Sequence, residues 1–165
     1  MTDLFGDVAT IKCLSLWQPW GSLVAKGVKR HETRHWSTEY RGPIAIHAAK
    51  TVVVEGAPVA LCIAALGKNW KFAVPRGEVV AIAELVGCRD AGRIVDQLTR
   101  ADYEAGNFAP GRFAWVLDKV RPLMRPVPLV GRQGLFNWTP PEDLESRLGP
   151  VVDHEAACRY IGSAT

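Results

Sequence analysis

The segment from Lys29 to Trp36 (KRHETRHW) contains eight residues and no aliphatic side chain. In a strand, successive side chains point to opposite faces, so neither face of this segment could pack against an apolar core. Such a strand either lines a polar cavity or lies at a solvated edge, where its charges discourage pairing with another chain. The segment lies between a helix-like apolar pattern at 20–27 and an alternating apolar stretch at 43–49. Because both neighbours are apolar, we favour the cavity.

The other patterns predict short strands and short helices without a regular strand–helix alternation. A helix is expected to have Pro19 at its first position and to end at Gly27, which suits a left-handed stop. Further strands are expected at 12–16, 43–49, 78–88 and 112–120, followed by a proline-rich edge strand. Further helices are expected at 51–66, where Pro58 splits the stretch into two pieces, and at 90–105, 140–149 and 153–161. This set predicts an α+β fold, a small and partly open β-barrel of five or six strands with peripheral helices.

Composition limits the class of protein. With 165 residues, 48% of them hydrophobic and 22% charged, the chain is expected to form one globular domain at 11–140, with an N-terminal arm at 1–10 and an acidic helical tail at 141–165. No apolar run approaches the roughly 18 residues of a membrane helix, which argues against a membrane protein. The start of the chain has no basic leader and the four cysteines form no CxxC pair, so we expect a cytoplasmic protein with reduced thiols.

The charge is unevenly distributed along the chain. Residues 1–132 hold 18 Lys and Arg against 12 Asp and Glu, whereas residues 133–165 hold 2 against 5. The body is therefore mildly basic and the tail acidic, which favours an anionic partner such as nucleic acid without requiring one. The acidic tail leaves a second possibility open, an interaction module within a larger regulatory assembly.

The sequence His31-Glu32-Thr33-Arg34-His35 matches the HExxH pattern of zinc enzymes. On a helix this spacing places two histidines on one zinc ion, with the glutamate polarising the bound water. On a strand the two histidines would lie about 13 Å apart, too far to share a metal. Since the segment has no aliphatic stripe to anchor a helix, we interpret the match as coincidental and predict neither a metal nor a cofactor.

Tryptophans and basic residues are interleaved at Trp17, Trp36 and Trp70, the last in a loop at 67–77 that is expected to be exposed. Nucleic-acid bases stack on indole faces while Lys and Arg contact phosphates. The alternative is that the tryptophans are core residues, which is the interpretation we adopt for Trp20 and Trp115. The turn Gly131-Arg132-Gln133-Gly134 could offer N–H groups and a guanidinium to a phosphate, although a tight turn alone would explain its glycines.

Residues 14–50 (LSLWQPWGSLVAKGVKRHETRHWSTEYRGPIAIHAAK) resemble the ASCH domain family (activating signal cointegrator homology), and the similarity continues at 77–85, 113–123 and 131–138. The resemblance implies a PUA-like β-barrel in which a cleft between the barrel and its first helices receives a nucleotide. Transferred to this sequence, that cleft would be bordered by Trp17, Gln18, Pro19, Lys29, Glu32, Arg34, Trp36 and Lys50. Four of these eight residues, Lys29, Glu32, Arg34 and Trp36, belong to the polar segment.

The first functional hypothesis is a non-catalytic domain that binds RNA, another single-stranded nucleic acid or a modified nucleoside. Trp17 or Trp36 would stack on a base, and Gln18 or Glu32 would read its hydrogen-bonding edge. Phosphate would be met by the basic residues Lys29, Arg34, Lys50 and Arg132.

The second hypothesis is a hydrolase of RNA or of a modified nucleoside, with Lys29 as base and Glu32 as acid or metal ligand. Members of the family include a magnesium-dependent ribonuclease and a branch that hydrolyses N4-acetylcytidine with a lysine, a threonine and a glutamate. The lysine corresponds to Lys29. Glu32 stands at the threonine position with Thr33 displaced by one, and Glu104 is the nearest counterpart of the glutamate. Two of the three roles are thus unmatched, so that activity is not assigned.

Overall fold

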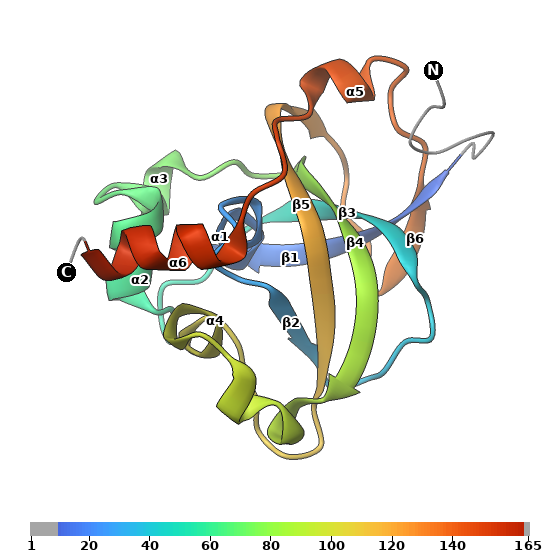
Figure 1. Cartoon of the computed structure of the whole chain (residues 1–165). Helices are drawn as coiled ribbons and strands as arrows, with labels where there is room; N and C mark the ends of the chain where they lie inside the picture. Colours follow the sequence, from blue (N-terminus) through green and yellow to red (C-terminus); the bar gives the residue numbers. More distant parts are fainter. Residues whose placement is uncertain (1–9, 164–165) are drawn as a thin grey trace.

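The computed structural model describes residues 10–163 (Figure 1), so the arm predicted at 1–10 lies almost entirely outside the described residues. Six strands form one sheet in the order β2-β5-β4-β3-β1-β6. Only β1 and β3 pair in parallel; the other neighbours are antiparallel. The strands are β1 Ile11–Gln18, β2 His31–Arg34, β3 Gly42–Val52, β4 Glu78–Asp90, β5 Phe113–Pro128 and β6 Leu135–Trp138.

Short helices surround this sheet. In Figure 1, α1, α2, α3 and α6 gather at one side of the sheet, with α4 next to them and α5 at the far end. Leu23, Leu61, Trp70 and Ala105 are buried together there, and Ile161 of the tail packs against them. The helices are α1 Trp20–Ala25, α2 Val59–Leu66, α3 Trp70–Ala73, α4 Arg100–Glu104, α5 Leu144–Arg147 and α6 His154–Ser163, with single turns at η1 Ala91–Arg93 and η2 Val95–Gln97.

The mixed α+β class, the six strands and the peripheral helices agree with the prediction, but the barrel is not confirmed. Within residues 10–163, β2 pairs only with β5 and β6 pairs only with β1, so the ladder has two edges and does not close. The β2 edge matters most for function. The polar segment forms an edge strand there, and the same segment also contributes to a pocket described below.

Both faces of the central strands are covered. Leu14, Ile44 and Ile46 belong to one apolar cluster, whereas the intervening Cys13 and Ala45 belong to a second cluster on the opposite face. Alternate residues of a strand point to opposite faces, and a strand buried on both sides reads as a nearly continuous apolar run. This rigid double-sided core carries β1 and β3, whose C-terminal ends hold Trp17 and Lys50.

Three predicted elements differ from the structure. The stretch at 51–66 is divided at Pro58 as expected, but the piece before Pro58 is not helical: β3 extends to Val52, and α2 begins only after the proline, which fits the start of a helix and not its interior. The 67–77 loop contains α3, and Trp70 is buried, 1% exposed, rather than presented to solvent. The helix expected at 90–105 is two single turns and α4, with the Asp90 side chain accepting a hydrogen bond from the Gly92 N–H.

The strand at 112–120 and the proline-rich stretch after it form one element, β5. β2 pairs only with residues 113–116 of it, and beyond β2 the same side of β5 has an isolated bridge between Leu123 and Leu148 instead of a strand. An edge position of this kind tolerates Pro122, Pro126 and Pro128, since proline cannot donate to a ladder. Lys119, with φ 47°, lies just before the prolines and interrupts the regular extended backbone.

Candidate functional site

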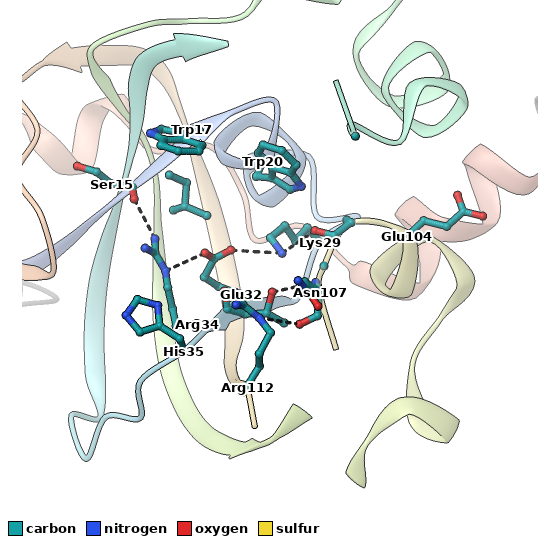
Figure 2. A pocket seen from close by; sticks show the side chains of 15 residues that line it. Ser15, Trp17, Trp20, Lys29, Glu32, Arg34, His35, Glu104, Asn107 and Arg112 are labelled. Carbon is teal, nitrogen blue, oxygen red and sulfur yellow. Dashed lines mark hydrogen bonds and ion pairs between the residues drawn. The ribbon is translucent and has the colours of Figure 1, made fainter. Parts of the chain in front are cut away.

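Two pockets meet at the end of β1. The first, here called the helix-side pocket, has a volume of about 390 Å³ and is formed by β1, α1, β2 and the turn after α4 (Figure 2). The second, the loop-side pocket, has a volume of about 720 Å³ and is formed by β1, β3 and the 129–134 loop. Both are in the size range of ligand pockets. Their common wall consists of Ser15, Trp17, Arg34 and His35.

A chain of charges lies at the bottom of the helix-side pocket. Lys29 Nζ is 3.3 Å from Glu32 Oε2, and Arg34 Nε is 3.0 Å from Glu32 Oε1. The second contact is an ion pair without hydrogen-bond alignment, because Arg34 Nε is buried and has no hydrogen-bond partner in the described part of the chain. Arg34 Nη2 instead donates to the Ser15 carbonyl at 2.9 Å. Figure 2 shows this line of contacts across the floor of the pocket.

Lys29 is the most buried of these groups, with 1% of its surface exposed. Besides its ion pair with Glu32, its Nζ donates to the His31 carbonyl at 2.6 Å and to the Ala105 carbonyl at 2.8 Å. Two of the three N–H donors of the ammonium are thus hydrogen-bonded, and Glu32 is an ion-pair partner of the same group. Lys29 therefore joins β2 to the turn after α4.

Asp102 of α4 holds the start of β2. Its Oδ1 accepts the backbone N–H groups of Arg30 at 2.9 Å and of His31 at 3.0 Å, and its Oδ2 bonds the His31 ring. Burial alone would raise the pKa of Asp102, but the hydrogen bonds and positive charge of His31, with the charge of Lys29, bring that pKa below its ordinary value. Asp102 is thus a buried carboxylate that positions the polar strand.

The opposite wall of the pocket is held by Thr33. Its hydroxyl accepts the Asn107 N–H at 2.9 Å, and its carbonyl accepts from Arg112 Nη2 at 3.1 Å. Glu104 also lines the pocket, but its carboxylate pairs with the exposed Arg100 at 2.8 Å. Figure 2 shows Glu104 pointing away from the Lys29–Glu32–Arg34 chain. Lys29, Thr33 and Glu104, the nearest counterparts of the residues of the N4-acetylcytidine hydrolase branch, thus all line this pocket, but each is bonded to another protein group.

The loop-side pocket contains cations of a different kind. Lys50 and Arg132 are exposed, and no residue between 10 and 163 makes a hydrogen bond or ion pair with either side chain. Trp36 forms part of the wall and packs edge-to-face on Trp115, with ring centroids 4.5 Å apart. His47 lies at the base, where its Nε2 donates to the Leu129 carbonyl at 2.8 Å. Burial lowers the pKa of His47, although this hydrogen bond opposes the shift.

With the geometry established, the comparisons with known proteins can be placed beside it. The family model of the ASCH domain matches residues 14–126, which include most of β1, all of β2 to β4 and most of β5. This chain belongs to the ASCH domain family. The match contains both walls of the helix-side pocket and leaves α6 and the Arg132 loop outside.

Relatives of this ASCH domain include the human Activating signal cointegrator 1, 33% identical over 98 residues, or 56% of this chain. The mouse Activating signal cointegrator 1 is 53% identical over 36 residues, or 22% of this chain. The chain spans 17% and 6% of the lengths of these relatives. The crystal structure of ASCH from Zymomonas mobilis has the same fold, with a TM-score of 0.51 and 19% identity over 85% of this chain and 96% of that one.

Most of the residues singled out from the sequence border the two pockets. Trp17 is 60% exposed and stands in the common wall, while Lys29, Glu32 and Arg34 line the helix-side pocket. Trp36, Lys50 and Arg132 line the loop-side pocket. The ASCH domain thus distributes the predicted set over two adjoining cavities rather than one cleft.

Gln18 is placed differently. Its side chain is fully buried, donates to the Ser22 hydroxyl and to the Pro75 carbonyl, both at 2.7 Å, and accepts the Ser22 N–H at 2.9 Å. It lines neither pocket. These bonds fix the turn at Pro19, where the Gln18–Pro19 peptide is cis, and leave no group to read a base. We therefore assign Gln18 a structural part in this ASCH domain.

The HExxH residues lie on β2 and the bend after it, not on a helix. The His31 ring is bonded to Asp102, whereas His35 is exposed at the common wall. Among residues 10–163, no cluster of three His, Cys, Asp or Glu side chains could hold a metal ion. None of the helices in the described part of the chain has the length and apolar character to span a membrane.

Sequence reasoning missed Asn107 and Arg112, which complete the helix-side pocket of the ASCH domain. Both lie in the connection between α4 and β5, more than 70 residues from Thr33, which they contact. No local pattern marks them. The only available signal is that Asn and Arg near glycines can position a loop, which applies to many connections.

Proposed function

We propose that this ASCH domain binds single-stranded RNA and holds one base in the helix-side pocket against the Trp17 indole. The observation that carries the proposal is Trp17 itself, because a large apolar ring that is 60% exposed beside a polar pocket is a ready stacking surface. The association of the ASCH family with RNA binding supports the same proposal. In this proposal the ligand is RNA and not a protein partner.

The floor of the pocket supports a base-binding role. Glu32 is held between two cations, so its carboxylate has a fixed position and can still accept from a base amino group through a free lone pair. Asn107 and Arg112 lie on the opposite wall and bring further polar groups to the rim. Polar groups held in fixed positions around a concave site orient a small ligand and give specificity.

The hydrolase hypothesis is not favoured. A general base needs a lone pair within reach of the substrate proton, and Lys29 is buried, hydrogen-bonded to two backbone carbonyls and ion-paired with Glu32. The Thr33 hydroxyl likewise accepts a backbone N–H. We therefore propose binding without turnover at this pocket.

The proposal is tested by titrating the full chain with an eight-nucleotide single-stranded RNA of mixed sequence and following tryptophan fluorescence. Stacking on an aromatic ring contributes about 1–3 kcal/mol per base, so Trp17→Ala should weaken binding about 5- to 150-fold. Phe72→Ala is the matched control, because Phe72 is 84% exposed and lies outside both pockets. Wild-type protein that shows no salt-dependent binding, or a Trp17→Ala variant that binds as tightly as the control, would overturn the proposal.

A further inference from the structure

The two pockets are adjoining parts of one surface. Ser15, Trp17, Arg34 and His35 contribute to both, so a ligand leaving the helix-side pocket over this wall enters the loop-side pocket directly. The exposed Trp17 ring stands at the crossing. A free nucleoside in the helix-side pocket would leave the larger, 720 Å³ pocket empty.

The loop-side pocket is rich in unpartnered positive charge. Lys50 and Arg132 make no hydrogen bond or ion pair within the described residues, unlike Arg34 in the common wall and Lys29 in the helix-side pocket. Exposed, unpaired cations beside a stacking surface are the combination that follows a nucleic-acid backbone. No acidic side chain lines this pocket. Its electrostatics therefore suit a phosphate group.

The backbone carrying Arg132 is held in position. The Leu129 N–H donates to the Gly77 carbonyl at 3.0 Å, and the Leu129 carbonyl accepts from His47 Nε2 at 2.8 Å. Gly131 approaches so closely that a Cβ there would lie 2.5 Å from His47 Cε1. The stem of Lys50 passes over Gly77, where an added Cβ would come within 3.2 Å of its Cε. A preformed site of this kind loses less entropy when it binds.

We propose that the ligand is a strand of at least two nucleotides, with a base in the helix-side pocket and the adjoining phosphate in the loop-side pocket. Lys50 and Arg132 are the phosphate contacts, and Trp17 separates the two positions. This inference rests on the proposed function, but it adds a second subsite and a minimum ligand length. The recognised chemistry is a phosphodiester attached to a stacked base.

The test compares the four ribonucleosides, the four dinucleotides UpU, CpC, ApA and GpG, and the eight-nucleotide RNA on wild-type protein and on Lys50→Gln/Arg132→Gln. A charged hydrogen bond to phosphate should make the preferred dinucleotide bind about tenfold or more tightly than its nucleoside at low salt. The double variant should lose that difference and bind nucleosides unchanged. For the octamer, the slope of log affinity against log salt should fall by about 1.4, or 0.7 per cation lost.

A matched control removes the same charge elsewhere. Lys68→Gln/Arg93→Gln changes two exposed cations that line neither pocket and should leave both the dinucleotide advantage and the salt slope close to wild type. Equal affinities for nucleoside and dinucleotide in the wild type would overturn the second subsite while leaving the proposed function intact. An identical salt slope in the two double variants would also overturn it. If no RNA binds the wild type, the proposed function fails first.

Discussion

The two pockets that meet at Trp17 hold their charges in opposite ways. In the helix-side pocket, Lys29 and Arg34 both pair with Glu32 and donate to backbone carbonyls. In the loop-side pocket, Lys50 and Arg132 have no protein partner among the described residues. The same residue types therefore serve two ends: charges satisfied within the fold shape a cavity, and charges left open are available to a ligand.

This difference has an energetic consequence. Removing one member of a buried ion pair leaves the other uncompensated, whereas removing an exposed and unpaired charge changes stability little. Even without a ligand, removing a charge should therefore lower the free energy of unfolding more in the helix-side pocket than in the loop-side pocket. The loss of RNA affinity on removing a positive charge should instead be larger in the loop-side pocket, because only cations without a protein partner release counterions from RNA.

The largest expected effect is at Lys29. Lys29→Met keeps the length of the side chain but leaves two buried carbonyls without a donor and removes one partner of Glu32, so the free energy of unfolding should fall by about 3–5 kcal/mol. Lys50→Met is the matched variant in the other pocket and should stay within about 0.5 kcal/mol of wild type. Urea unfolding measures both. Similar values for the two lysines would remove the contrast between the pockets.

The second effect is at the loop that carries Arg132. In Gly131→Ala, the new methyl group would lie 2.5 Å from His47 Cε1 and 2.7 Å from Ser15 Oγ, closer than real contacts allow. Forcing extra volume into a packed site costs about 1–3 kcal/mol, so the variant should unfold at lower urea concentration. Gly92→Ala is the control, because its nearest neighbour would be at an ordinary 3.5 Å. A Gly131→Ala variant as stable as this control would show that the loop is not held against β1 and β3.

How much of this arrangement is predictable from sequence depends on the range of the interactions. The polar segment at Lys29–Trp36 predicts a strand that borders a cavity, because face alternation is a local property; it forms β2 at an edge and lines a pocket. Gly27 and Pro58 delimit helices for similarly local reasons. The six-stranded α+β class follows from such local patterns.

Which cations are buried and paired, and which stay exposed and unpaired, is not predictable from such local patterns. Lys29 and Lys50 are both lysines next to apolar strands, but Lys29 also donates to the Ala105 carbonyl, 76 residues away, which ties it to the turn after α4. The sequence predicts that Trp70 lies in an exposed loop, but in the structure α3 buries this side chain in the apolar cluster with Leu23 and Leu61. In each case the deciding contact comes from an element far away in the chain.

The third prediction concerns the wall formed by Thr33. Thr33→Val removes the acceptor of the Asn107 N–H while keeping the shape of the side chain, and a lost hydrogen bond of this kind costs about 1 kcal/mol. Thr33→Ser restores the hydroxyl and should recover most of the loss. The comparison uses urea unfolding together with hydrogen exchange at the Asn107 amide, which should accelerate only in the valine variant. Unchanged exchange would show that the helix-side pocket does not depend on this bond.

The smallest effect is a pH dependence at the base of the loop-side pocket. Burial lowers the pKa of His47 from its ordinary value of 6.5, so between that value and the folded pKa the unfolded chain binds more protons than the native one. The free energy of unfolding then rises with pH across this interval, and the contribution of His47 is lost as pH falls below 6.5. His47→Gln can still donate to the Leu129 carbonyl but cannot titrate, so its stability should decline less than that of wild type between pH 7 and pH 5 (urea unfolding at each pH). If the free energy of unfolding depended on pH equally in the two proteins, His47 would not be buried against the loop. The argument that the Arg132 loop is held in a fixed position would then fail.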